Sequence, residues 1–94
     1  QRQMCIRDRM RGASLALTSS PVVIGRNPES SLSVDDDSIS GSHARISPDP
    51  HGWIIEDLGS TNGTWLDDQR LLEAAPLVVG STIRLGRTVL EARA

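Results

Sequence analysis

Residues 53–66 read WIIEDLGSTNGTWL, and this stretch indicates the fold class. It opens with an apolar run, Trp53-Ile54-Ile55, passes through a segment rich in Gly, Ser, Thr and Asn, and ends on Trp65-Leu66. β-Branched and aromatic residues favour strands, whereas Gly, Asn and Ser favour turns. The stretch therefore predicts two short strands joined by a Gly-rich loop.

Short apolar runs separated by turn residues continue on both sides of this stretch. Val22-Val23-Ile24 stops at Gly25, Asp67-Asp68 resembles a hairpin tip, and turn signals recur about every 6–12 residues. No window carries a helical apolar stripe, and Pro76 interrupts the best helix candidate, residues 69–75. The pattern predicts an all-β fold, an antiparallel sandwich or barrel, with almost no helix.

Composition limits the kinds of partner. The 94 residues allow one domain, and its core must consist of Leu, Ile, Val and Ala, because the only aromatic residues are Trp53 and Trp65. All ten basic residues are Arg, yet residues 12–94 hold six Arg against eleven Asp or Glu, a balance of −5. An acidic body argues against nonspecific binding to nucleic acid or membranes. Any anion site must be a local arrangement of donors.

Cysteine usage and hydropathy suggest a compartment. Cys5 is the only cysteine, so the chain can form neither an internal disulfide nor a cysteine metal cage, and a reducing compartment fits. No apolar run reaches the roughly 18 residues of a membrane span. We expect no membrane insertion, no metal and no cofactor. Residues 35–37, Asp-Asp-Asp, lack the alternating ligands of a calcium loop and are predicted to form a solvated acidic turn.

Residues 1–11, QRQMCIRDRMR, differ from the rest of the chain. They show neither strand alternation nor a helical stripe, and they hold four of the ten arginines. We predict a non-native or disordered lead-in at 1–11 and a single domain at 12–94. A short basic arm for an acidic partner is the alternative.

Three segments resemble the forkhead-associated (FHA) family: residues 24–26 (IGR), 39–46 (ISGSHARI) and 57–66 (DLGSTNGTWL), with a weaker match at 79–86 (VGSTIRLG). The resemblance implies an FHA/SMAD-like β-sandwich of eleven strands in two antiparallel sheets, with ligand loops at one end. It also implies a first strand within residues 1–10 and a hairpin at Gly12. Because residues 1–10 do not read as a strand, we expect the first strand to be missing.

The resemblance implies binding of phosphothreonine peptides and no enzymatic activity. A phosphate carries about −1.5 to −2 charge and three acceptor oxygens, so a binder needs converging donors. An arginine fork, hydroxyl groups and backbone N–H groups supply them. The amide of Asn62 has both a donor and an acceptor, and the resemblance implies that it binds the peptide backbone beside the phosphothreonine. The phosphopeptide-binding candidates are Arg26, Ser40, Gly41, Ser42, Thr61 and Asn62, and the loop-supporting candidates are Gly25, His43, Gly59 and Gly63.

The sequence departs from the family pattern at Gly41, where members commonly carry Arg, Lys or Asn. Arg26 is then the single cationic side chain of the pocket, because strand alternation points Arg45 elsewhere. We expect binding to be weaker by one charge-assisted hydrogen bond, about 1.5–3 kcal/mol. Ser38, short and neutral, predicts little preference for an acidic residue three positions after the phosphothreonine.

Two other functions fit single features. A pocket with a single cationic side chain suits a module that docks onto proteins without phosphate. Ser40, His43 and Asp57 could also be read as the triad of a hydrolase. We predict no triad, because two residues three positions apart on a loop do not set its geometry and no nucleophile-elbow motif is present. The expected partner is a protein phosphorylated by a Ser/Thr kinase, and the domain is expected to belong to a larger, bacterial, multidomain protein. We expect cytoplasmic residence, because phosphothreonine signalling needs kinases that use ATP.

Overall fold

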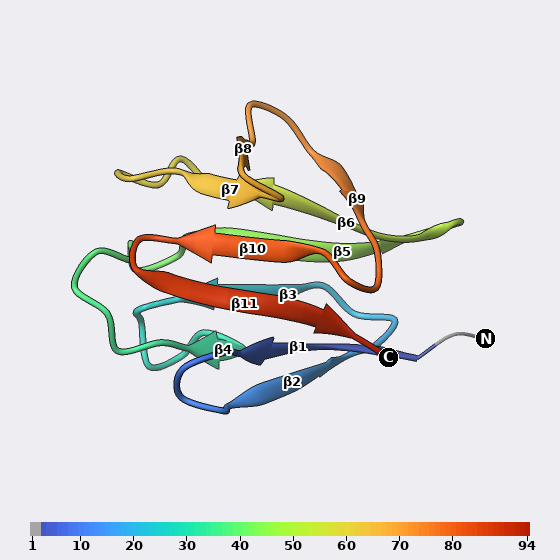
Figure 1. Ribbon diagram of the computed structural model, residues 1–94, viewed down its shortest axis with the longest axis horizontal. Helices are drawn as coiled ribbons and strands as arrows, with labels where there is room; N and C mark the ends of the chain where they lie inside the picture. Colours follow the sequence, from blue (N-terminus) through green and yellow to red (C-terminus); the bar gives the residue numbers. More distant parts are fainter. Residues whose placement is uncertain (1–2) are drawn as a thin grey trace.

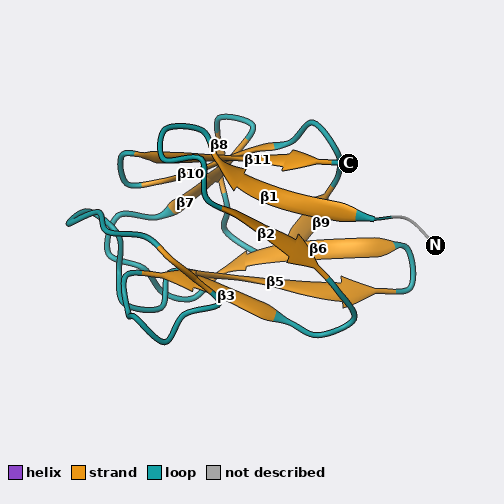
Figure 2. Ribbon diagram, turned by 90° about the horizontal axis from the view of Figure 1, so that it is seen from below, coloured by secondary structure: helices purple, strands orange, loops and turns teal. Residues whose placement is uncertain are grey.

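The computed structural model describes residues 3–94 and arranges eleven strands in two sheets, with no helix among these residues. Figure 1 shows the strands running along the long axis, and Figure 2 shows the two sheets as stacked layers. The six-stranded sheet has the order β2 (Ser14–Leu17), β1 (Met4–Asp8), β11 (Thr88–Arg93), β10 (Thr82–Leu85), β7 (Thr64–Leu66) and β8 (Gln69–Arg70). The predicted all-β sandwich is confirmed.

The second sheet has five strands. Its order is β4 (Leu32–Ser33), β3 (Val22–Gly25), β5 (Ala44–Asp49), β6 (Gly52–Asp57) and β9 (Ala75–Leu77). All strand pairs in the two sheets are antiparallel except β3 with β4, which are parallel through Ile24 and Leu32.

The core lies between the sheets and follows from the alternation of side chains along each strand. In β6, Trp53 and Ile55 are buried while Ile54 is half-buried. In β10, Ile83 and Leu85 have no exposed surface. The core is aliphatic apart from Trp53, as the composition predicts.

The first strand is present. Met4–Asp8 form β1, which pairs with β11 on one side and β2 on the other, and Met4 and Ile6 are buried. The expected disorder is therefore wrong for residues 4–8, whereas the loss of a native first strand stays a prediction. The alternation was obscured because the third inward position is a charged residue, Asp8, whose buried carboxylate accepts N–H groups from Met10 and Arg11. Residues 1–2 lie outside the described part, and a non-native origin of 1–11 stays a prediction.

Several turns match their predicted chemistry. Asp67 and Asp68 have φ of 48° and 69° and join β7 to β8, so they form the predicted hairpin tip. Gly12, with φ of 78°, lies in the β1–β2 hairpin. Loops β3–β4, β4–β5, β6–β7 and β10–β11 gather at one end of the sandwich, on the left in Figure 1, while the start of β1 and the C-terminus lie at the other. The candidate residues belong to this loop end.

Candidate functional site

His43 joins two of these loops. It is fully buried directly before β5, where its Nδ1 accepts the backbone N–H of Ser40 (3.1 Å) and its Nε2 lies 2.8 Å from the carbonyl oxygen of Gly63. With Nδ1 acting as acceptor, Nε2 carries the hydrogen and donates it to Gly63. Both ring nitrogens are used within the protein. His43 therefore fastens the β4–β5 loop to the β6–β7 loop and has no free nitrogen for a ligand.

The end of β3 runs along the β4–β5 loop. The N–H of Arg26 donates to the carbonyl of Ser40 (3.0 Å), and the N–H of Asn27 donates to that of Gly41 (3.1 Å). Gly25 permits this approach, because a Cβ on Gly25 would collide with the carbonyl oxygen of Gly41. These contacts hold the backbone of Arg26 beside Ser40.

Hydroxyl groups are left available at the meeting point of the loops. Ser40 Oγ accepts the N–H of Thr61 (3.1 Å). Within residues 3–94 the Ser40 hydroxyl hydrogen and the hydroxyls of Ser42 and Thr61 make no hydrogen bond. Ser42 and Thr61 are exposed and Ser40 is half-buried. Three hydroxyl groups can thus donate to a ligand at this end.

Asn62, in the β6–β7 loop, is hydrogen-bonded to the β4–β5 loop. Its Nδ2 donates to the carbonyl of Ser38 (2.9 Å), and its Oδ1 accepts no hydrogen bond within the part of the chain that is described. The Asn62 side chain is exposed. Its oxygen can therefore accept a hydrogen bond from a ligand.

The guanidinium of Arg26 is exposed and contacts one carboxylate. Its Nη2 lies 3.4 Å from Oδ1 of Asp37, and the two side chains are 52% and 85% exposed. A pair this exposed contributes little to stability. Arg26 can therefore leave Asp37 and bind a phosphate instead at a small cost in free energy.

Asp57 shapes the β6–β7 loop. Its carboxylate accepts the N–H groups of Gly59 (2.9 Å) and Ser60 (3.0 Å) and the hydroxyls of Ser60 and Thr64. Burial alone would raise the pKa of Asp57, but these hydrogen bonds outweigh it and lower the pKa below its usual value. The loop also uses left-handed backbone at Gly59 (φ 75°) and Gly63 (φ 86°).

Ser40, His43 and Asp57 are not arranged as a catalytic triad. Asp57 bonds to its own loop, and the Nδ1 of His43 accepts a backbone N–H rather than the hydroxyl of Ser40. The three residues do not form the chain of side-chain hydrogen bonds that a nucleophilic serine requires.

The prediction of a solvated acidic turn at residues 35–37 is wrong for Asp36, which is buried. Asp35 and Asp37 are exposed, but Asp36 is 5% exposed and accepts the N–H of Ser38 (2.8 Å), the N–H of Arg87 (3.2 Å) and the hydroxyl of Thr88 (2.7 Å). Burial would raise the pKa of Asp36, but the hydrogen bonds lower it well below its usual range.

Asp36 thus fastens the β4–β5 loop to the β10–β11 turn. Sequence reasoning missed this role, although a signal existed. Leu32, Val34 and Asp36 are buried in alternation, which continues the strand period beyond β4.

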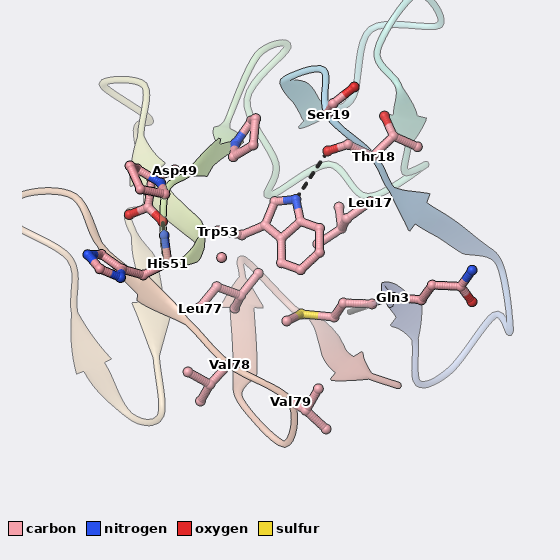
Figure 3. A pocket seen from close by; sticks show the side chains of 14 residues that line it. Gln3, Leu17, Thr18, Ser19, Asp49, His51, Trp53, Leu77, Val78 and Val79 are labelled. Carbon is pink, nitrogen blue, oxygen red and sulfur yellow. Dashed lines mark hydrogen bonds between the residues drawn. The ribbon is translucent and has the colours of Figure 1, made fainter. Parts of the chain in front are cut away.

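A separate pocket of about 860 Å³ lies at the opposite end of the sandwich. Trp53, Leu77 and Val79 line it, and the Trp53 indole donates to the carbonyl of Thr18 (Figure 3). Its lining includes none of the predicted ligand residues. Residues 3–94 contain no His, Cys, Asp and Glu cluster suited to a metal ion. They also contain no helix long and apolar enough to cross a membrane.

Two packed β-sheets, with an arginine and several hydroxyl groups on adjoining loops at one end, define a β-sandwich domain with a candidate anion site. The FHA domain profile matches residues 22–86. The chain belongs to the FHA domain family, whose members are interaction modules.

Known proteins resemble the chain closely. FhaB, an FHA domain-containing protein of Mycolicibacterium smegmatis, is 45% identical over 82 residues, covering 87% of this chain and 53% of that protein. The chain thus spans about half the length of the curated relatives it matches.

Solved structures share the fold. One, from an analysis of phosphothreonine-dependent FHA domain interactions, superposes with a TM-score of 0.91 at 26% identity and covers 99% of this chain and 97% of that one. EmbR of Mycobacterium tuberculosis, in complex with a low-affinity phosphopeptide, gives a TM-score of 0.88 at 26% identity, covering 99% of this chain and 24% of that one.

Proposed function

We propose that the chain is a phosphothreonine-peptide binding domain that recruits proteins phosphorylated by Ser/Thr kinases. The observation that carries the proposal is the gathering of the Arg26 guanidinium and the free hydroxyls of Ser40 and Thr61 at the loop end of an FHA fold. Phosphothreonine-dependent interaction in a structural neighbour supports it.

Each residue has a distinct task in this proposal. Arg26 exchanges Asp37 for phosphate oxygens, and Ser40 and Thr61 donate hydroxyl hydrogens to the remaining oxygens. Gly41 and Ser42 add a backbone N–H and a hydroxyl from the β4–β5 loop. Asn62 accepts a peptide N–H beside the phosphothreonine. Gly25, His43, Gly59 and Gly63 hold the loops in place.

The cellular setting is part of the same proposal. A reader of kinase products works where kinases use ATP, which places the domain in the cytoplasm. We propose a binding role without catalysis, a role supported by the hydrogen bonds that commit both ring nitrogens of His43 to backbone groups. We place the domain within a larger bacterial protein.

The test is fluorescence-anisotropy binding to an oriented phosphothreonine peptide library. Matched unphosphorylated and phosphoserine peptides serve as controls. We expect binding to phosphothreonine peptides, weaker binding to phosphoserine peptides and none to unphosphorylated ones. Equal binding to phosphorylated and unphosphorylated peptides by folded protein would overturn the proposal in favour of phosphate-independent docking.

A further inference from the structure

Arg70 stands apart from the other arginines of residues 12–94. This segment is acidic, and four of its six arginines pair with a carboxylate: Arg26, Arg45, Arg87 and Arg93. Arg84 instead lies over the Trp65 ring, with its Cζ 4.8 Å from the ring centroid. Arg70 is exposed and makes no ion pair or hydrogen bond within residues 3–94. Its donors are free for an external anion.

The position of Arg70 brings this cation to the ligand loops. Arg70 ends β8, an edge strand, and is paired with Trp65, the second residue after Gly63. Its guanidinium lies close to Gly63, because a Cβ built on that glycine would be 2.9 Å from Arg70 Nε and 3.1 Å from Cζ. Gly63 directly follows Asn62. Arg70 therefore lies beside the residue assigned to the peptide backbone.

We propose that Arg70 determines specificity by binding an anionic side chain next to the phosphothreonine. This inference rests on the proposed function. A guanidinium fork matches a carboxylate or a second phosphate, and both groups supply the same paired oxygens. Gly41 leaves the phosphate pocket itself with the single cationic side chain of Arg26. Arg70 supplies a second positive charge outside that pocket, directed at a flanking residue.

The experiment scans the neighbours of the phosphothreonine. Peptides carry alanine, aspartate, asparagine or a second phosphothreonine at each flanking position in turn, and anisotropy measures their affinities for the wild type, Arg70→Gln and Arg84→Gln. We expect the wild type to prefer an anion at one position by about threefold to tenfold. Arg70→Gln should lose that preference and keep its affinity for the alanine peptide. Arg84→Gln should keep both. The aspartate and phosphothreonine arms show which anion is preferred.

Three outcomes would overturn the inference. The wild type could bind peptides with anionic and neutral flanking residues equally well, or Arg70→Gln could retain the preference for an anion. Arg70→Gln could also reduce the affinity for every peptide to the same extent, which is expected if Arg70 only supports Gly63 structurally. Thermal melting of Arg70→Gln shows whether the fold is intact. Failure of the proposed function looks different, since no phosphothreonine peptide would then bind better than its unphosphorylated form.

Discussion

At the scale of single residues, the site combines groups that a sequence motif reveals with groups that it hides. The motifs shared with the FHA family predict Arg26, Ser40 and Thr61 as phosphate ligands, and the structure places all three at the loop end. The partner of Arg26 was not predictable, since an Asp-Asp-Asp run does not say which carboxylate turns inward and which faces the arginine. The structure buries Asp36 and leaves Asp37 3.4 Å from Arg26.

Asp37 should act as an internal competitor for the phosphate. Asp37→Asn removes the carboxylate that pairs with Arg26 and a negative charge near the bound phosphate, so we predict about twofold to fivefold tighter binding of a phosphothreonine peptide. Anisotropy titration at low salt measures the change. Asp35→Asn is the matched control, because Asp35 is also exposed and its carboxylate makes no ion pair within residues 3–94. Unchanged affinity in Asp37→Asn would show that Asp37 does not compete.

At the scale of elements, loops rather than strands carry the site, and buried polar side chains fix the loops. His43→Ala removes the hydrogen bonds to Ser40 and Gly63 and leaves buried groups without partners. We predict a loss of about 2–4 kcal/mol in the free energy of unfolding, together with weaker peptide binding. Urea denaturation measures the first. His51→Ala, an exposed loop position, should leave stability unchanged; equal losses in the two variants would contradict the bracing role.

The same loops should respond to acid. A carboxyl whose folded-state pKa is lowered contributes its full stability above the unfolded-state value of about 3.9 and loses it as the pH falls through the folded-state value. Asp36 and Asp57 both have lowered pKa values. We therefore predict that the free energy of unfolding falls steadily below about pH 5.

Asp36→Asn separates the contribution of Asp36. It should be less stable at pH 7 than the wild type and should lose less stability between pH 5 and pH 3. Urea denaturation across this range is the measurement. Parallel curves for the two proteins would show that protonation of Asp36 does not drive the acid effect.

Strands were predictable where both inward positions are apolar and a turn residue follows, as in Val22-Val23-Ile24 before Gly25. Prediction failed where a charged residue faces inward, at Asp8 in β1 and at Asp36 after β4. An apolar run also does not set where a strand ends, since β9 ends at Leu77 and the apolar Val78 and Val79 after it are exposed. Burial of charge depends on partners distant in the chain, such as Thr88 for Asp36, and local patterns do not contain them.

At the scale of the whole molecule, the sandwich depends on pairing between the first strand of the chain, β1, and the last strand, β11. β1 lies between β2 and β11, and Ile6 has no exposed surface. Ile6→Ala should therefore reduce the free energy of unfolding by about 2–5 kcal/mol. Ile54→Ala, at a half-buried position of β6, should cost less. If Ile6→Ala were neutral in urea denaturation, residues 4–8 would not form part of the folded domain.

Arg26→Ala tests the central claim most directly, with Arg45→Ala as its matched control. Both arginines are about half-exposed and each pairs with one carboxylate, Asp37 for Arg26 and Glu56 for Arg45, but only Arg26 lies at the ligand loops. We predict that Arg26→Ala abolishes measurable anisotropy binding of a phosphothreonine peptide without lowering the melting temperature, and that Arg45→Ala binds like the wild type. Retained phosphopeptide binding in Arg26→Ala would contradict the assignment of this loop end as the phosphothreonine site.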